Sequence, residues 1–246
     1  MSNLSTSLLF GVVAALANVV GGLIVVARRS PWEPRLLHGF VALGAGFMLA
    51  AALLRMGPEA ARLSAHGPLL VLIGYLVVHL FEHTIASHFH FGEETHSHLF
   101  IGSSVWASAF VGLVVHSLFD GISIASGFLV SPALGTLVFT AIILHKMPEG
   151  FTIASVMVAA GVSRLGALAA AFGVGLASIF GVLAASALAG HVGAALALST
   201  GVTLYVAASD LIPEVNKEEG TLMAILVFAG VALFYVSEAA LTALGL

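Results

Sequence analysis

The sequence has no cysteine and very few charged residues. Without cysteine the chain forms no disulfide and offers no thiolate to a metal ion. Charged residues make up 8% of the 246 residues, whereas a water-soluble domain carries roughly a quarter. The net charge of −4 gives no indication of a nucleic-acid partner. So little charge cannot cover a surface exposed to water, which excludes a soluble domain.

Hydrophobic residues make up 60% of the chain and fall in long blocks. A helix needs about 20 apolar residues to cross a bilayer, and eight such blocks lie between polar or proline-bearing breaks. The predicted fold class is all-α, with one polytopic transmembrane domain over residues 1–246. The first block lacks the features of a cleaved signal peptide and is expected to be retained. The predicted spans are residues 4–27, 37–57, 68–86, 99–129, 133–161, 164–189, 192–213 and 221–245.

Positive charge in the loops predicts the orientation, because Lys and Arg are in excess on the cytoplasmic side. With the arginine-rich first loop inside, five Lys and Arg residues fall inside and two, Arg55 and Arg62, fall outside. Both termini are then expected to face out. Compactness and the lack of sorting signals favour a bacterial inner membrane. Glu238, in the last span, is expected to pair with Arg55 because both lie toward the outer side.

The second and seventh spans repeat each other. One is an even-numbered span and the other an odd-numbered span, so the repeated segments cross the membrane in opposite directions. Many transporters are built from inverted repeats of this kind. The matching residues are Gly46, Leu49, Ala52, Pro58 and Glu59 in the second span and Gly201, Leu204, Ala207, Pro213 and Glu214 in the seventh.

The fourth and fifth spans share the pattern H-x-x-x-[DE]-G-x-x-I-A-S, once from His116 and once from His145. In each copy the His and the carboxylate are four residues apart, so they share one helical face. The short connection between the spans makes them antiparallel neighbours, which places His116 level with Glu149 and Asp120 level with His145. At about 1.5 Å per residue, this level is roughly 22 Å from the connection, near the middle of the membrane.

Ionisable groups at that depth are costly and mark an ion pathway or a bound ion. Two imidazoles and two carboxylates suit Zn²⁺ and tolerate iron, manganese, cobalt or cadmium as divalent ions. The predicted metal ligands are therefore His116, Asp120, His145 and Glu149. The alternative is a hydrogen-bonded His–carboxylate network that locks the two helices together.

Two neighbours shape this predicted site. Pro148 leaves the carbonyl of Leu144 without a helical donor, so a kink or a freed carbonyl ligand is expected there. Lys146 lies too deep to reach either surface. It either excludes a second cation or pairs with a nearby carboxylate.

Further polar residues are expected at the cytoplasmic mouth. The loop at about residues 87–98 is His-rich, and such tracts often bind metal; a solvated loop without function is the alternative. Asp210 and Glu214 either line the exit or cap the seventh span, whereas His38, His66 and His191 are interpreted as isolated interfacial residues. The candidate exit and loop ligands are His79, Glu82, His83, His88, His90, His96, His98 and Asp210.

At these motifs the chain resembles the ZIP (Zrt-/Irt-like) family of metal transporters. HSLFDG at 116–121 and HKMPEG at 145–150 are similar to the family's fourth- and fifth-helix motifs. The resemblance implies helices one to three and six to eight as inverted repeats around helices four and five. It also implies movement of Zn²⁺ or related ions toward the cytoplasm by elevator-like alternation, usually in a homodimer. The family's primary metal site falls on the four predicted ligands.

Some family members hold a second metal through Asn or Asp after each motif His and a Glu in the sixth helix. Here those positions carry Ser117, Lys146 and Ser178, so one transported ion is expected. Asp210 falls where the family has an acidic inner-exit residue.

The leading interpretation is a metal transporter in the lipid bilayer, with Zn²⁺ as its substrate, and not an enzyme. The alternative is a membrane-embedded metal-dependent hydrolase or oxygenase. Because catalytic zinc usually has three protein ligands and an open position, four ligands favour transport. A metal-sensing receptor without flux is a third possibility.

Overall fold

The computed structural model describes residues 3–27, 34–84, 103–187, 189–218 and 220–245. Within these ranges the chain is helical and has no strand. Eight helical spans in the described residues are long and apolar enough to cross a membrane. The predicted all-α fold class with eight spans is therefore confirmed.

Six of the spans are single helices and two are composite. The second span consists of α2, η1 and α3, and the seventh consists of α8, η4 and α9. The elements are α1 (Asn3–Ala27), α2 (Pro34–Ala51), η1 (Ala52–Met56), α3 (Gly57–Leu63), α4 (Gly67–Thr84), α5 (Ser103–Val130), α6 (Pro132–Ala159), α7 (Arg164–Ala187), η3 (Ala189–His191), α8 (Val192–Tyr205), η4 (Val206–Leu211), α9 (Ile212–Val215) and α10 (Leu222–Ala243).

Both composite spans contain a π-helical segment just before a proline. Pro58 and Pro213 lie in the first turn of the short α-helices that follow. A proline has no N–H and crowds the carbonyl four residues earlier, and the wider π turn accommodates both effects. The predicted ends of these spans, at residues 57 and 213, were too early. The chain stays helical beyond each proline because a proline in the first turn of a helix is tolerated.

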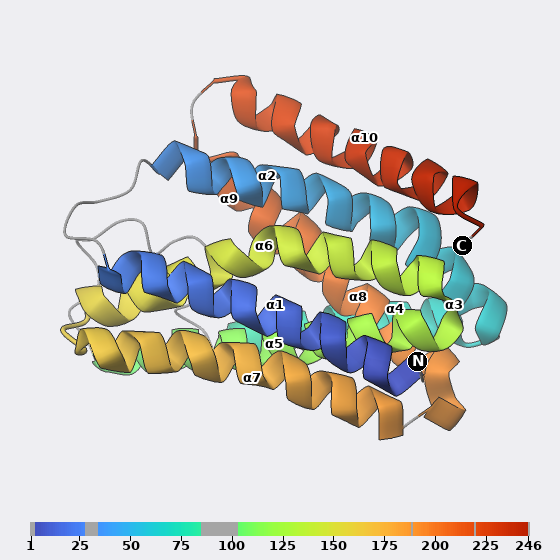
Figure 1. Ribbon diagram of the computed structural model, residues 1–246, viewed down its shortest axis with the longest axis horizontal. Helices are drawn as coiled ribbons and strands as arrows, with labels where there is room; N and C mark the ends of the chain where they lie inside the picture. The colour runs from blue at the N-terminus through green and yellow to red at the C-terminus, as the bar shows by residue number, and fades with distance from the viewer. Residues whose placement is uncertain (1–2, 28–33, 85–102, 188, 219, 246) are drawn as a thin grey trace.

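The helices pack in two groups that meet at the centre (Figure 1). In one group α1, α5, α6 and α7 contact one another. In the other, α10 packs along α2 and α4 packs along α8. Contacts of α2 with α6 and of α8 with α5 join the groups, so the two motif-bearing helices lie at the junction. Both termini lie at the same end of the bundle, as eight spans require (Figure 1).

Glycines allow helices of the second group to touch through their backbones. A Cβ added to Gly46 of α2 would lie 2.0 Å from the carbonyl oxygen of Val227 in α10. A Cβ added to Gly201 of α8 would lie 2.0 Å from the carbonyl oxygen of Val71 in α4. Small residues at such crossings are how membrane helices approach closely.

Arg55 and Glu238 form the predicted ion pair, with 3.4 Å between Arg55 Nε and a Glu238 carboxylate oxygen. Pro148 lies inside α6, which is helical from Pro132 to Ala159. The kink or freed Leu144 carbonyl expected at this proline stays a prediction.

Replacing Gly46 by Ala should destabilise the protein by about 1–3 kcal/mol, because the new methyl group meets a backbone carbonyl that cannot move aside. Gly39→Ala is the matched control on the same helix. There a Cβ lies 3.4 Å from the end of the flexible Leu226 side chain. Thermal unfolding of the purified protein in detergent measures both variants. Equal stability of the two would contradict the packing described at Gly46.

Candidate metal centre

A one-residue connection holds the two motif-bearing helices side by side. Only Ser131 separates α5 from α6, and its hydroxyl accepts a hydrogen bond from the Leu134 backbone N–H at 3.1 Å. Pro132 then begins α6 with a backbone angle suited to a first helical turn. The helices must run antiparallel, and this register brings the two copies of the motif to the same level.

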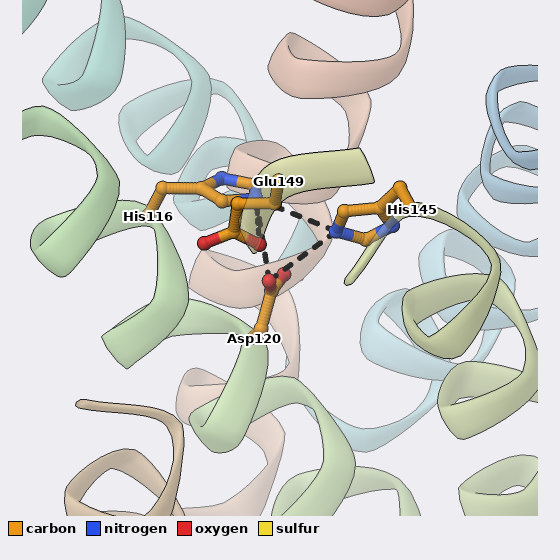
Figure 2. A group of neighbouring side chains, drawn as sticks. All are labelled: His116, Asp120, His145 and Glu149. Atoms are coloured by element: carbon orange, nitrogen blue, oxygen red, sulfur yellow. Dashed lines mark hydrogen bonds and ion pairs between the residues drawn. The ribbon is translucent and has the colours of Figure 1, made fainter. Parts of the chain in front are cut away.

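Three of the four predicted ligands converge on a triangle of atoms (Figure 2). Asp120 Oδ2 lies 3.2 Å from His116 Nε2 and 3.3 Å from His145 Nε2. The two imidazole nitrogens lie 3.4 Å apart. Ligand atoms bound to tetrahedral zinc at about 2.0–2.1 Å are separated by roughly 3.3 Å. The triangle therefore has the dimensions of one face of a tetrahedral zinc site.

Glu149 stands at the fourth corner. Its Oε2 lies 4.0 Å from His116 Nε2, and the ligand atoms of all four residues lie within 4.8 Å of one another. The other carboxylate oxygen, Oε1, accepts a hydrogen bond from the Ser117 hydroxyl at 2.6 Å. A tetrahedral site with edges of roughly 3.3 Å would require the most widely separated of these atoms to approach by up to about 1.5 Å.

A second contact fixes the ring of His145. Its Nδ1 lies 3.1 Å from the carbonyl oxygen of Ala141, one turn earlier in α6. A carbonyl only accepts hydrogen bonds, so this contact places a proton on Nδ1. Metal-binding histidines are commonly oriented in this way. Nε2 of His145 is thus the ring nitrogen that faces the other three candidate ligands.

Lys146 lies fully buried beside this cluster and pairs with both carboxylates. Its Nζ is 2.8 Å from Asp120 Oδ2 and 2.6 Å from Glu149 Oε2. It also donates a hydrogen bond to the Ser117 hydroxyl. Of the two expectations for Lys146, pairing with a carboxylate is confirmed, and it involves both.

The cluster is shielded from solvent except at one residue. His145 and Glu149 are fully buried and Asp120 is nearly so, whereas the His116 side chain is 12% exposed. The contacts among the four side chains also fit the alternative of a purely structural hydrogen-bonded network. The assignment of the four as metal ligands stays a prediction, and metal binding tests it.

Some of the exit residues form a polar group on α4 and the seventh span. The Tyr205 hydroxyl donates to Glu82 Oε2 at 2.9 Å, and the rings of His79 and His83 lie 4.2 Å apart. Asp210 is buried in η4, in the same span as Tyr205. Polar side chains of α4 and the seventh span therefore lie together on the side of the predicted exit. The loop candidates His88, His90, His96 and His98 lie outside the described residues.

His38 differs from its predicted role as an isolated interfacial residue. It is buried near the start of α2, with Nδ1 2.7 Å from Glu218 Oε1 and Nε2 3.5 Å from Glu214 Oε1. Lys217 also pairs with Glu214 at 2.9 Å. The prediction that His38 is isolated was wrong, because its partners lie far from it in the sequence. Its interfacial position stays a prediction.

The repeat between the second and seventh spans indicated the ion pair between Glu214 and Lys217. Pro58-Glu59 and Pro213-Glu214 are each followed three residues after the Glu by a basic residue, Arg62 and Lys217. In both places the acid and the base form an ion pair at i, i+3. The Pro-Glu-x-x-[Arg/Lys] pattern was therefore readable from the sequence.

Comparison with known proteins identifies the family of this chain. The model of the ZIP zinc transporter family matches residues 103–238, which include α5 to α9 and most of α10. The chain therefore belongs to the ZIP family, whose members are multi-pass membrane transporters and not enzymes. A curated relative, zinc transporter ZIP9 of Micropogonias undulatus, is 30% identical over 95 residues. That segment covers 38% of this chain and 30% of the relative, so the chain matches less than a third of the relative's length.

Replacing Asp120 by Asn should weaken zinc binding at least about tenfold, because it removes one charge and one anionic ligand without changing shape. Equilibrium dialysis of the purified protein against radioactive Zn²⁺ measures the effect. Glu59→Gln makes the same chemical change at a carboxylate paired with Arg62 outside the cluster, and should leave binding unchanged. Wild-type affinity in the Asp120 variant would favour the purely structural network.

Proposed function

We propose that this chain transports divalent transition-metal ions, above all zinc, across the membrane toward the cytoplasm through one His/carboxylate site. The triangle of His116 Nε2, His145 Nε2 and Asp120 Oδ2, with edges of 3.2–3.4 Å, is the observation that carries the proposal. Imidazole and carboxylate ligands at this spacing suit zinc. The name of the matched relative, a zinc transporter, supports the same substrate.

The charge of the cluster supports a single divalent ion as the substrate. Asp120 and Glu149 bring two negative charges and Lys146 one positive charge to a nearly dry interior. One dication changes the net charge from −1 to +1, whereas a second would raise it to +3. Such a charge is too costly to bury. Iron, manganese, cobalt and cadmium have related ligand preferences and are further candidate substrates.

We interpret the first three spans and the last three spans as inverted repeats around α5 and α6. The first repeat is α1, α2 to α3, and α4, and the second is α7, α8 to α9, and α10. Gly46 contacts Val227 as Gly201 contacts Val71, and a π segment precedes the proline in both composite spans. The helix pairs also correspond between the two repeats. The packing of α2 on α10 matches that of α8 on α4, and the packing of α1 on α6 matches that of α7 on α5. Inverted repeats that hold a substrate at their interface support alternating access from the two sides.

The inner route proposed for the ion runs past Asp210 and Glu82. The burial of Asp210 in the seventh span and the hydrogen bond from Tyr205 of that span to Glu82 support this route. With the predicted orientation the route opens to the cytoplasm near the His-rich loop, where the loop histidines would receive the ion. A homodimer in a bacterial inner membrane, with both termini outside, stays the prediction for the assembled protein.

A membrane-embedded hydrolase fits the cluster less well. A catalytic zinc keeps an open position for water and substrate, whereas here four protein ligands surround the position and three of them are buried. Family membership also favours transport. A receptor that senses metal without moving it could use the same four ligands. A flux measurement distinguishes such a receptor from a transporter.

Replacing His116 or Glu149 by Ala should abolish saturable zinc uptake into liposomes that contain the purified protein, because each change removes one of four ligands. His66→Ala is the matched control, since His66 is exposed in the turn between α3 and α4. Uptake should be compared for zinc, iron, manganese, cobalt and cadmium. Wild-type uptake in either site variant would remove the site assignment. Binding without flux would favour a receptor, and lipid turnover without flux would favour a hydrolase.

Zinc uptake should weaken as the pH is lowered equally on both sides of the liposome membrane. Imidazoles must be neutral and carboxylates ionised to bind a metal ion, so protons compete with zinc for the ligands. Initial rates at low zinc concentration measure the effect, and a saturating zinc concentration should recover much of the lost rate. An uptake rate that rises as the pH falls would contradict competition at these ligands.

A further inference from the structure

We propose that Lys146 is a tethered cation that competes with the transported ion for the two carboxylates and so weakens metal binding enough for release. This inference rests on the proposed function. It gives a role to a fully buried lysine whose ammonium group contacts both carboxylates of the cluster.

The ammonium group contacts the same oxygen atoms that face the imidazoles. Asp120 Oδ2 lies 2.8 Å from Lys146 Nζ and also completes the triangle with His116 and His145. Glu149 Oε2 lies 2.6 Å from Lys146 Nζ and 4.0 Å from His116 Nε2. A metal ion bound by these ligands must therefore share both oxygens with the lysine.

Lys146 is held at the cluster by its contacts. Its side chain is fully buried near the middle of a long helix, and the Ser117 hydroxyl accepts a hydrogen bond from it. Ser117 in turn donates to Glu149 Oε1. The lysine, the serine and the glutamate form a closed arrangement that keeps the ammonium group beside the ion.

The charges determine the direction of the effect. With Lys146, the carboxylates are partly neutralised before the ion binds, and the filled cluster carries a net positive charge. Without Lys146, the empty cluster carries two unbalanced negative charges and a dication makes it neutral. Because buried net charge is costly, Lys146 stabilises the empty cluster and destabilises the filled one. Both effects lower the affinity for metal.

Lys146→Gln tests this role because it removes the charge and keeps a polar side chain, while Lys146→Arg keeps the charge. Isothermal titration calorimetry of the full-length protein in detergent with Zn²⁺ alone measures affinity. We expect Lys146→Gln to bind Zn²⁺ about tenfold or more tightly than wild type, with lower values of both KM and maximal rate in liposome uptake. Lys146→Arg should stay within about threefold of wild type. Unchanged or weaker binding by the Gln variant would overturn the inference.

A thermal measurement keeps the test decisive if the Gln variant is unstable. Zn²⁺ should raise the unfolding temperature of Lys146→Gln more than that of wild type, because the dication replaces the missing ammonium group. A lysine that only holds α5 to α6 predicts an equal or smaller shift, and that result would reject the competition. If wild type itself neither binds nor transports Zn²⁺, the proposed function fails instead.

Discussion

Two carboxylates buried in a membrane protein must be balanced by positive charge, and the centre of this structure is organised around that requirement. Asp120 and Glu149 lie almost completely out of reach of water. An unpaired ionised group in such surroundings is unfavourable by several kcal/mol. Lys146 supplies one balancing charge and leaves a net charge of −1 in the cluster. Under the proposed function a divalent ion would change that net charge to +1. The fold therefore needs positive charge at this level, and the proposed metal site rests on that need.

Close helix packing produces the dry surroundings on which this balance depends. Gly121 and Gly150 directly follow the two carboxylates in the sequence. A Cβ on either glycine would lie 1.9 Å from a backbone carbonyl oxygen, that of Ser178 in α7 or that of Asn18 in α1. Backbone contact beside each carboxylate brings α7 and α1 close to the cluster. The glycine of the repeated motif is thus explained by packing and the carboxylate before it by chemistry.

The sequence was sufficient to predict most of this arrangement because the relevant signals are local or duplicated. Eight apolar blocks predicted the spans, and the short Ser131-Pro132 connection predicted that Asp120 would meet His145. The structure places these two side chains in contact at 3.3 Å. The two copies of the motif carry the same information twice, which made the convergence of the four residues predictable.

Features that depend on distant segments were not predictable in the same way. The pairing of His38 with Glu218 joins the second span to the turn after the seventh. Neither residue has a neighbour in sequence that indicates the other. The π segments depend on how each proline is accommodated within its packed helix. The close contacts at Gly46 and Gly201 depend on which helices cross, which apolar composition does not specify.

The duplication is also informative where it is imperfect. In the two motif copies the His and the acidic residue are retained, whereas the position after the His is Ser117 in α5 and Lys146 in α6. These two residues contact each other, and the serine accepts the hydrogen bond that the lysine donates. The matching positions therefore provide the proposed ligands from both helices, while the differing position places one fixed charge on one side of the proposed ion site. Affinity is set at that position because a symmetric pair of neutral residues would leave two full negative charges to hold the dication, and an ion held so firmly would leave slowly.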